Sequence, residues 1–130
     1  MAETYTLSVS AGTLREDDPL FTSPHRWTEG GVSVRGAFSG AHLLHVAVGG
    51  CVLNDVYREA EDAGVDVLGV RVAVSGGFDP ATWASTGIGY AVEVDAAADD
   101  AAVAALLDRV EAVAEIPKAL TRGTAVTRLR

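Results

Sequence analysis

The chain has 130 residues, of which 48% are apolar, so residues 1–130 can bury the core of a single domain. Ten basic against 18 acidic residues give a net charge of −8, which argues against binding to nucleic acid or to an anionic membrane surface. No apolar run reaches transmembrane length, and the first ten residues do not resemble a signal peptide. With a single cysteine, no intramolecular disulfide can form, so we expect a cytoplasmic protein.

The first third of the chain has the pattern of short strands. The stretch YTLSVSAG, residues 5–12, alternates apolar and polar side chains as a half-buried strand does. A second strand is expected in FTSPHRW, residues 21–27, where Pro24 indicates a sheet edge or a bulge. A brief third strand is expected at Val32–Val34.

From Ala41 the apolar spacing becomes helical, with Ser39 as a suitable N-cap and Gly64 as a suitable C-cap. This helix contains Gly49 and Gly50, which together disfavour it by about 1 kcal/mol per glycine relative to alanine. A kink or restart of the helix at this pair would place Cys51 at a new helix N-terminus.

The rest of the chain alternates between strands and helices, with no internal repeat. The order of all the expected elements predicts an α+β fold. In the second half we expect strands over residues 65–76 and 87–95, a helix capped by Asp99 or Asp100, a short helix from Pro117 closed by Gly123, and a last strand over residues 124–129.

Cys51 can be interpreted in two ways. It lies on the same helical stripe as Leu44 and Val48, and a free cysteine on such a stripe is often a packed structural residue. At a helix N-terminus, the unpaired N–H groups would instead stabilise a thiolate, lower the thiol pKa and make Cys51 a nucleophile. Asp55, four residues later, would act against this by raising the thiol pKa if both side chains were buried.

Two stretches carry a resemblance to a known family. Residues 42–76, HLLHVAVGGCVLNDVYREAEDAGVDVLGVRVAVSG, and residues 116–129, IPKALTRGTAVTRL, resemble the osmotically inducible protein C and organic hydroperoxide resistance (OsmC/Ohr) family. The resemblance covers roughly residues 30–130. It implies an OsmC-like fold, in which an antiparallel sheet wraps around a long central helix, and an interlocked homodimer with two sites at the subunit interface.

The resemblance also implies a reaction. Members of this family reduce organic hydroperoxides with a pair of cysteines, and Cys51 matches the peroxidatic one. The resolving cysteine is replaced by Ile116, or by Glu115 in the alternative register, so turnover would need an external thiol. The glutamate that the family places at the helix start is replaced by Ala41 or His42.

An arginine from the amino-terminal hairpin assists the cysteine in the family. Arg15 is the best positional match in this chain, with Arg26 and Arg35 as alternatives. Arg15 is also flanked by acidic residues, with which it could form a surface ion pair. The expected catalytic residues are therefore Cys51, Arg15 and His42.

His42 and His45 lie three residues apart, which raises the question of a metal site with Cys51. The six residues between His45 and Cys51 put the two side chains on different faces of a straight helix, so we expect no metal, and no sequence motif indicates an organic cofactor. A histidine that supports the thiol is a better expectation than a metal ligand, and a plain interface or helix-start histidine is a better expectation still. The alternative to an enzyme is a homodimer that has lost turnover and binds a small apolar or thiol ligand at the interface.

Overall fold

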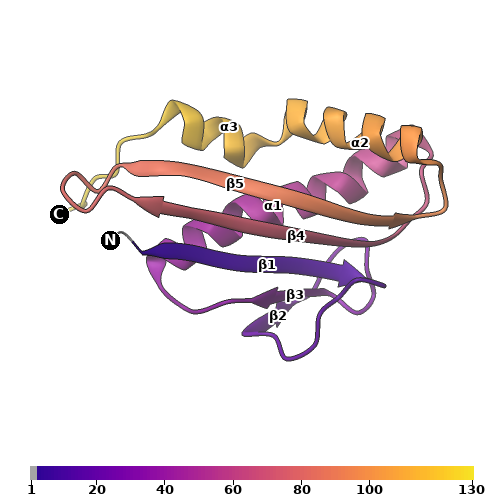
Figure 1. The fold of residues 1–130 in the computed structure, drawn as a ribbon, viewed down its shortest axis with the longest axis horizontal. Helices are drawn as coiled ribbons and strands as arrows, with labels where there is room; N and C mark the ends of the chain where they lie inside the picture. Colours follow the sequence, from indigo (N-terminus) through magenta and orange to yellow (C-terminus); the bar gives the residue numbers. More distant parts are fainter. Residues whose placement is uncertain (1–2) are drawn as a thin grey trace.

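The computed structural model describes residues 3–130. All strand pairs are antiparallel and form one five-stranded sheet in the order β2-β3-β1-β4-β5 (Figure 1). The fold class is thus α+β, as predicted. The elements are β1 (Thr4–Gly12), β2 (Phe21–Ser23), β3 (Val32–Arg35), α1 (Gly40–Ala63), β4 (Val67–Phe78), β5 (Ser85–Ala96), α2 (Asp100–Val113) and α3 (Glu115–Arg122).

The core lies between the sheet and the long helix α1. Val9 of β1 pairs with Val72 of β4, and α1 covers this face of the two strands with Val52 and Val56, all of them fully buried. Helices α2 and α3 follow the β5 edge of the sheet and contact α1 (Figure 1). The alternation in β1 and β4 therefore separates a valine-rich inner face from a polar outer face.

Helix α1 has the predicted ends. The Ser39 side chain accepts a hydrogen bond from the backbone N–H of His42, and Gly64 ends the helix with φ of 68°. The helix is continuous from Gly40 to Ala63, so the expected interruption at Gly49 and Gly50 is wrong.

The two glycines have different environments. A Cβ atom at Gly49 would lie 3.0 Å from methyl groups of both Val9 and Val74, so glycine lets the helix approach the sheet closely. A Cβ atom at Gly50 would meet nothing within 4 Å. Packing within one chain thus explains Gly49 but not Gly50.

Two expected strands differ from the structure. β2 ends at Ser23, because Pro24 cannot donate a hydrogen bond to the sheet, and a loop follows instead of the rest of the strand. Residues 123–130 follow α3 as an extended segment that pairs with no strand of the described chain, so the predicted last strand is absent. Val126 and Leu129 in this tail are 94% and 90% exposed.

The later helices begin and end close to their expected positions. Asp99, rather than Asp100, caps α2 by accepting a hydrogen bond from the backbone N–H of Ala102. Pro117 lies in the first turn of α3, where its missing N–H is tolerated, and Gly123 follows the last turn. Among residues 3–130, no helix is long and apolar enough to cross a membrane.

Candidate functional site

Cys51 lies in the middle of α1 and is half-buried. Because the helix runs through this position without a break, the backbone N–H groups around Cys51 are engaged in the helix. The positive end of a helix dipole is therefore not available to the thiol, and the predicted thiolate at a helix N-terminus is wrong.

Two carboxyl groups lie beside the Cys51 sulfur. Sγ is 3.9 Å from Oδ2 of Asp55, one helical turn later, and the Glu115 carboxylate reaches the same point from the first residue of α3. One ligand-type atom from each of the three residues lies within 4.8 Å of the other two. Of the two residues that the resemblance aligns with a resolving cysteine, Glu115 and not Ile116 therefore presents its side chain to Cys51.

This environment raises the pKa of the Cys51 thiol. Burial is the largest cause, and the negative charges of Asp55 and Glu115 add to it, while a backbone hydrogen bond from Ile116 acts in the opposite direction. This direction is opposite to the lowered pKa expected of a cysteine at a helix N-terminus. The pKa of Asp55 is also raised, first by burial and then by the charge of Glu115.

Arg58 is the cation of this cluster. Its guanidinium lies 3.1 Å from Oδ2 of Asp55 and 3.9 Å from an oxygen of Glu115. Sequence reasoning missed Arg58, although its spacing was a usable signal. It follows Asp55 by three residues and Cys51 by seven, which puts all three on one face of a helix.

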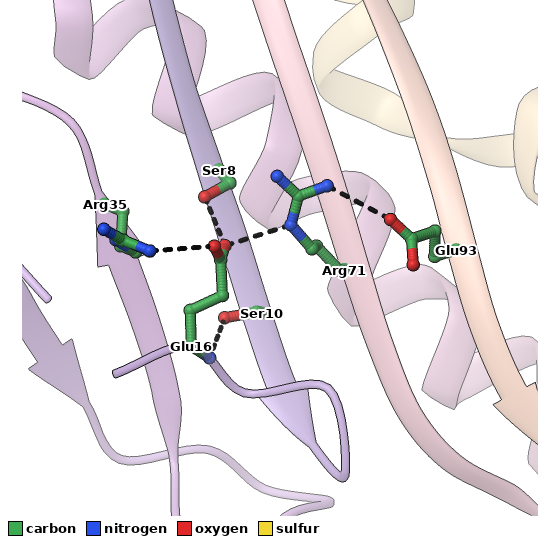
Figure 2. Close-up of polar contacts among 6 residues, drawn as sticks. All are labelled: Ser8, Ser10, Glu16, Arg35, Arg71 and Glu93. Atoms are coloured by element: carbon green, nitrogen blue, oxygen red, sulfur yellow. Dashed lines mark hydrogen bonds and ion pairs between the residues drawn. The ribbon is translucent and has the colours of Figure 1, made fainter. Parts of the chain in front are cut away.

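The three arginines expected to assist Cys51 lie elsewhere in the chain. Arg35 pairs at 3.2 Å with Glu16, and the same carboxylate pairs at 3.1 Å with Arg71 (Figure 2). Arg26 stacks on Trp27, with its guanidinium 5.2 Å from the ring centroid.

Arg15 is exposed and lies beside Gly30, and none of its neighbouring acids forms an ion pair with it in residues 3–130. The turn that carries Arg15 is held on the outer face of the sheet, where the backbone N–H of Glu16 donates to the Ser10 hydroxyl (Figure 2). Within one chain the structure does not bring Arg15 to Cys51.

The histidines do not contact the cysteine either. His42 bonds to the Ser39 hydroxyl at 2.6 Å and packs its ring against Tyr5 at a centroid distance of 4.9 Å. It precedes Cys51 by nine residues, which is half a turn out of phase on the helix. His45 is fully buried and bonds to the backbone carbonyl of Ala41 at 2.6 Å.

A mainly apolar cavity of about 330 Å³ lies near Cys51, although Cys51 is not one of its lining residues. Val48 in its wall lies one turn before Cys51, and Pro117 follows Glu115 by two residues. Tyr90 is close enough to the thiol for the charge of Cys51 to contribute to its raised pKa, after burial and Glu111. The lining residues come from α1, β5 and α3 and are Leu44, Val48, Ser85, Gly87, Ile88, Tyr90, Pro117, Leu120 and Thr121.

Four aromatic residues in or next to loops, Trp27, Phe38, Phe78 and Trp83, do not line this cavity. Phe38 and Trp83 are largely exposed, at 76% and 73%. Phe78 packs against Tyr5 and His45. Trp27 packs with His25, whose ring lies 5.3 Å from that of Tyr57 on α1. Tyr90 is the aromatic side chain that the alternation of β5 brings to the cavity.

Comparison with known proteins identifies the family and the fold of this chain. The sequence model of the OsmC-like protein family matches residues 31–128, and the chain belongs to this family. The fold is similar to the crystal structure of an OsmC-like hydroperoxide resistance protein from Jannaschia sp. CCS1. That similarity has a TM-score of 0.64 at 13% identity and covers 98% of this chain and 93% of the other. A search among curated protein sequences finds no match.

Proposed function

We propose that this protein reduces organic hydroperoxides with Cys51 as the nucleophile. The observation that carries the proposal is a half-buried thiol beside an apolar cavity, in a chain of the OsmC-like family. The Jannaschia protein with the same fold is described as a hydroperoxide resistance protein, which supports the same class of activity here. An alkyl or aryl group in the cavity would direct its peroxide oxygens towards the sulfur.

The first step is oxidation of the thiolate. The Cys51 thiolate attacks the distal peroxide oxygen, the O–O bond breaks, and the sulfur becomes a sulfenic acid. The leaving alkoxide takes a proton and departs as an alcohol. The peroxide is reduced by two electrons and the sulfur is oxidised by the same two electrons.

Regeneration needs an external low-molecular-weight thiol, because the chain has one cysteine and presents Glu115 where a resolving thiol would stand. One such thiol attacks the sulfenic sulfur and releases water, which leaves a mixed disulfide on Cys51. A second thiol attacks this disulfide, releases a small disulfide and restores the Cys51 thiol. A reducing cytoplasm would supply these thiols.

Cationic groups must offset the two carboxylates at Cys51 for the thiolate to form. Arg58 supplies one guanidinium within the chain. We assign a second to Arg15 of another protomer, since Arg15 is exposed and does not reach Cys51 within its own chain. His42 would act in the same way only across an interface, given its position half a turn away from Cys51 on α1.

A homodimer is part of this proposal, and two features of the chain support it. Gly50 and the exposed Ala47 leave one side of α1 open, and small residues there suit the close approach of a second helix. The tail after α3 exposes Val126 and Leu129 almost completely, and a second chain could cover them. These features also explain why Gly50 has no packing role within one chain.

A second function is favoured by the charges around the sulfur. Burial, Asp55 and Glu115 all raise the pKa of Cys51 and so disfavour the thiolate, as expected of a thiol that does not turn over. In this alternative the protein is a catalytically degenerate OsmC-like homodimer whose cavity binds a small apolar or thiol ligand.

Consumption of peroxide with dithiothreitol as the external thiol separates the two functions. An enzyme consumes cumene hydroperoxide faster than hydrogen peroxide, and the Cys51→Ser variant consumes neither above background. Leu44→Trp, which fills the cavity, should slow the reaction with cumene hydroperoxide and leave that with hydrogen peroxide unchanged. Equal rates for wild type and Cys51→Ser would exclude the enzyme, and the cavity would then be assayed for ligands.

A further inference from the structure

Cys51, Asp55 and Glu115 form a cluster whose chemistry is not limited to peroxide reduction. The sulfur and one oxygen from each carboxyl group all lie within 4.8 Å of one another. Cys51 and Asp55 are four residues apart on α1, so their side chains share one helix face. Glu115 approaches from α3, which makes the cluster a junction between two helices.

The charges of this cluster do not balance. With the thiol ionised, Cys51, Asp55 and Glu115 carry three negative charges, against one positive charge on Arg58. The next arginine along this surface, Arg109, pairs with Glu59 at 3.0 Å and does not neutralise the cluster. Within one chain, two negative charges therefore remain, which is the charge that one divalent cation would offset.

The Asp55 carboxyl group provides a second, independent observation. Its side chain is fully buried, and Oδ1 makes no hydrogen bond of ordinary geometry in the described chain, although the Asn54 side chain lies close enough to lower the pKa of Asp55. Oδ2 lies 3.9 Å from the Cys51 sulfur, and Oδ1 shares the same carboxyl carbon, so the unpaired oxygen lies at the cluster. A buried, unpaired carboxylate oxygen is costly unless a cation or a donor reaches it.

We propose that Cys51, Asp55 and Glu115 bind one divalent cation of the Zn²⁺ class. One thiolate and two carboxylates are ligand types that Zn²⁺ accepts, and three protein ligands leave a fourth position open. Tetrahedral Zn²⁺ needs a sulfur-to-oxygen distance of about 3.5 Å, close to the separation of Cys51 and Asp55. Glu115, whose side chain is 61% exposed, has room to complete the set.

Arg58 does not prevent this binding. Its side chain is 41% exposed, and its Nε lies 3.7 Å from Glu59, so the guanidinium can turn towards Glu59 when a metal replaces it at Asp55. The metal site does not depend on the peroxidase activity proposed above. It shares the Cys51 sulfur with that activity, however, so a bound metal should shield the thiol from electrophiles.

Titration of the full-length, metal-free protein with Co²⁺, a spectroscopic probe for Zn²⁺ sites, tests this proposal. We expect one Co²⁺ per chain and a thiolate-to-cobalt charge-transfer band in the near ultraviolet. Zn²⁺ should displace Co²⁺ and should slow alkylation of Cys51 by iodoacetamide. Binding without the charge-transfer band, or no binding at all, would overturn the proposal.

Variants locate the ligands. Cys51→Ser should lose the charge-transfer band, and Glu115→Gln should weaken Co²⁺ binding by about tenfold or more. Glu115 is exposed, so its replacement should leave the fold intact, whereas Asp55→Asn changes a buried group. Glu61→Gln, at an exposed position on α1, is the matched control and should bind as wild type does. Equal affinity in Glu115→Gln and Glu61→Gln would contradict the site. Peroxide oxidation of Cys51 in the presence of EDTA is measured separately, so failure of one proposal is distinguishable from failure of the other.

Discussion

Oδ2 of Asp55 lies 3.9 Å from Sγ of Cys51, one turn further along the same helix. A fully buried carboxyl group at this distance opposes the formation of a thiolate, and Glu115 strengthens the effect from α3. Burial is thus the largest cause of the raised pKa of the Cys51 thiol, Asp55 and Glu115 add to it, and the end of a helix plays no part.

Removing one of these acids should make Cys51 more reactive. In metal-free buffer, we expect Glu115→Gln to lower the pKa of the Cys51 thiol, because a negative charge that disfavours the thiolate is lost. The thiolate absorbance followed against pH gives this pKa directly, and iodoacetamide alkylation at pH 7 should become several-fold faster. Glu61→Gln, at an exposed position on α1, should leave both quantities unchanged. An unchanged or raised pKa in Glu115→Gln would contradict the assigned electrostatics.

Gly49 should be intolerant of even a methyl group. Alanine at this position gains about 1 kcal/mol of helix propensity, but its Cβ would press on Val9 and Val74 at 3.0 Å, and overpacking typically costs about 1–3 kcal/mol. We therefore expect Gly49→Ala to reduce the free energy of unfolding, as measured by urea denaturation. Gly40→Ala, where a Cβ meets nothing within 4 Å in the first turn of the same helix, is the control and should not destabilise the protein. A Gly49→Ala variant as stable as Gly40→Ala would show that the helix does not sit this close to the sheet.

Much of the fold could be predicted because its signals are local. The alternation in β1, β4 and β5, the Ser39 cap and the Gly64 end all follow from neighbouring residues. The break at Gly49 and Gly50 was predicted wrongly, because glycine propensity is a local property and the close approach to Val9 and Val74 is not. Residues 124–129 have the alternation of a strand, but no strand in residues 3–130 pairs with them.

The site was less predictable than the fold. Helix spacing predicts that Asp55 lies beside Cys51 and raises the pKa of its thiol. Glu115 joins the two residues only through the packing of α3 on α1, which the spacing does not reveal. The prediction that Arg15 assists Cys51 rested on the position of Arg15 in the sequence. The structure shows that the turn after β1 folds over the outer face of the sheet, and no local pattern in the sequence encodes that direction.

The open side of α1 should be the surface that binds a second chain. Gly50→Gln puts a long polar side chain where nothing lies within 4 Å in the single chain, so the folded chain should tolerate it while helix-to-helix contact should not. Light scattering after size exclusion should show a dimer for wild type and a monomer for Gly50→Gln, with unchanged circular dichroism. Ala104→Gln, at an exposed position on α2, should remain dimeric. A monomeric wild type, or a dimeric Gly50→Gln, would refute this interface.

Glu16 should stabilise the protein in a pH-dependent manner. Burial raises its pKa, but the Ser8 hydroxyl and the guanidinium groups of Arg71 and Arg35 outweigh burial and lower it (Figure 2). Because the folded-state pKa is lower than the unfolded one, this stabilisation is complete above the ordinary glutamate pKa of about 4.3. It is lost as the pH falls through the folded-state pKa.

Urea denaturation of Glu16→Gln at several pH values checks this expectation. At pH 7 the variant should be less stable than wild type by about 1–2 kcal/mol, since the carboxylate is only partly buried. The difference should shrink as the solution is acidified. Glu93→Gln, which also removes a partner of Arg71 but at a side chain that is 64% exposed, should have a smaller effect. A difference that does not change with pH would exclude the ion pairs as its cause.

The measurement that tests the central claim most directly is the intact mass of the protein after one equivalent of cumene hydroperoxide, with dimedone present to trap a sulfenic acid. The account predicts rapid formation of one dimedone adduct per chain, slower formation with hydrogen peroxide, and none in Cys51→Ser. A wild-type protein that stays unmodified after long exposure to cumene hydroperoxide would contradict the assignment of Cys51 as a peroxidatic nucleophile.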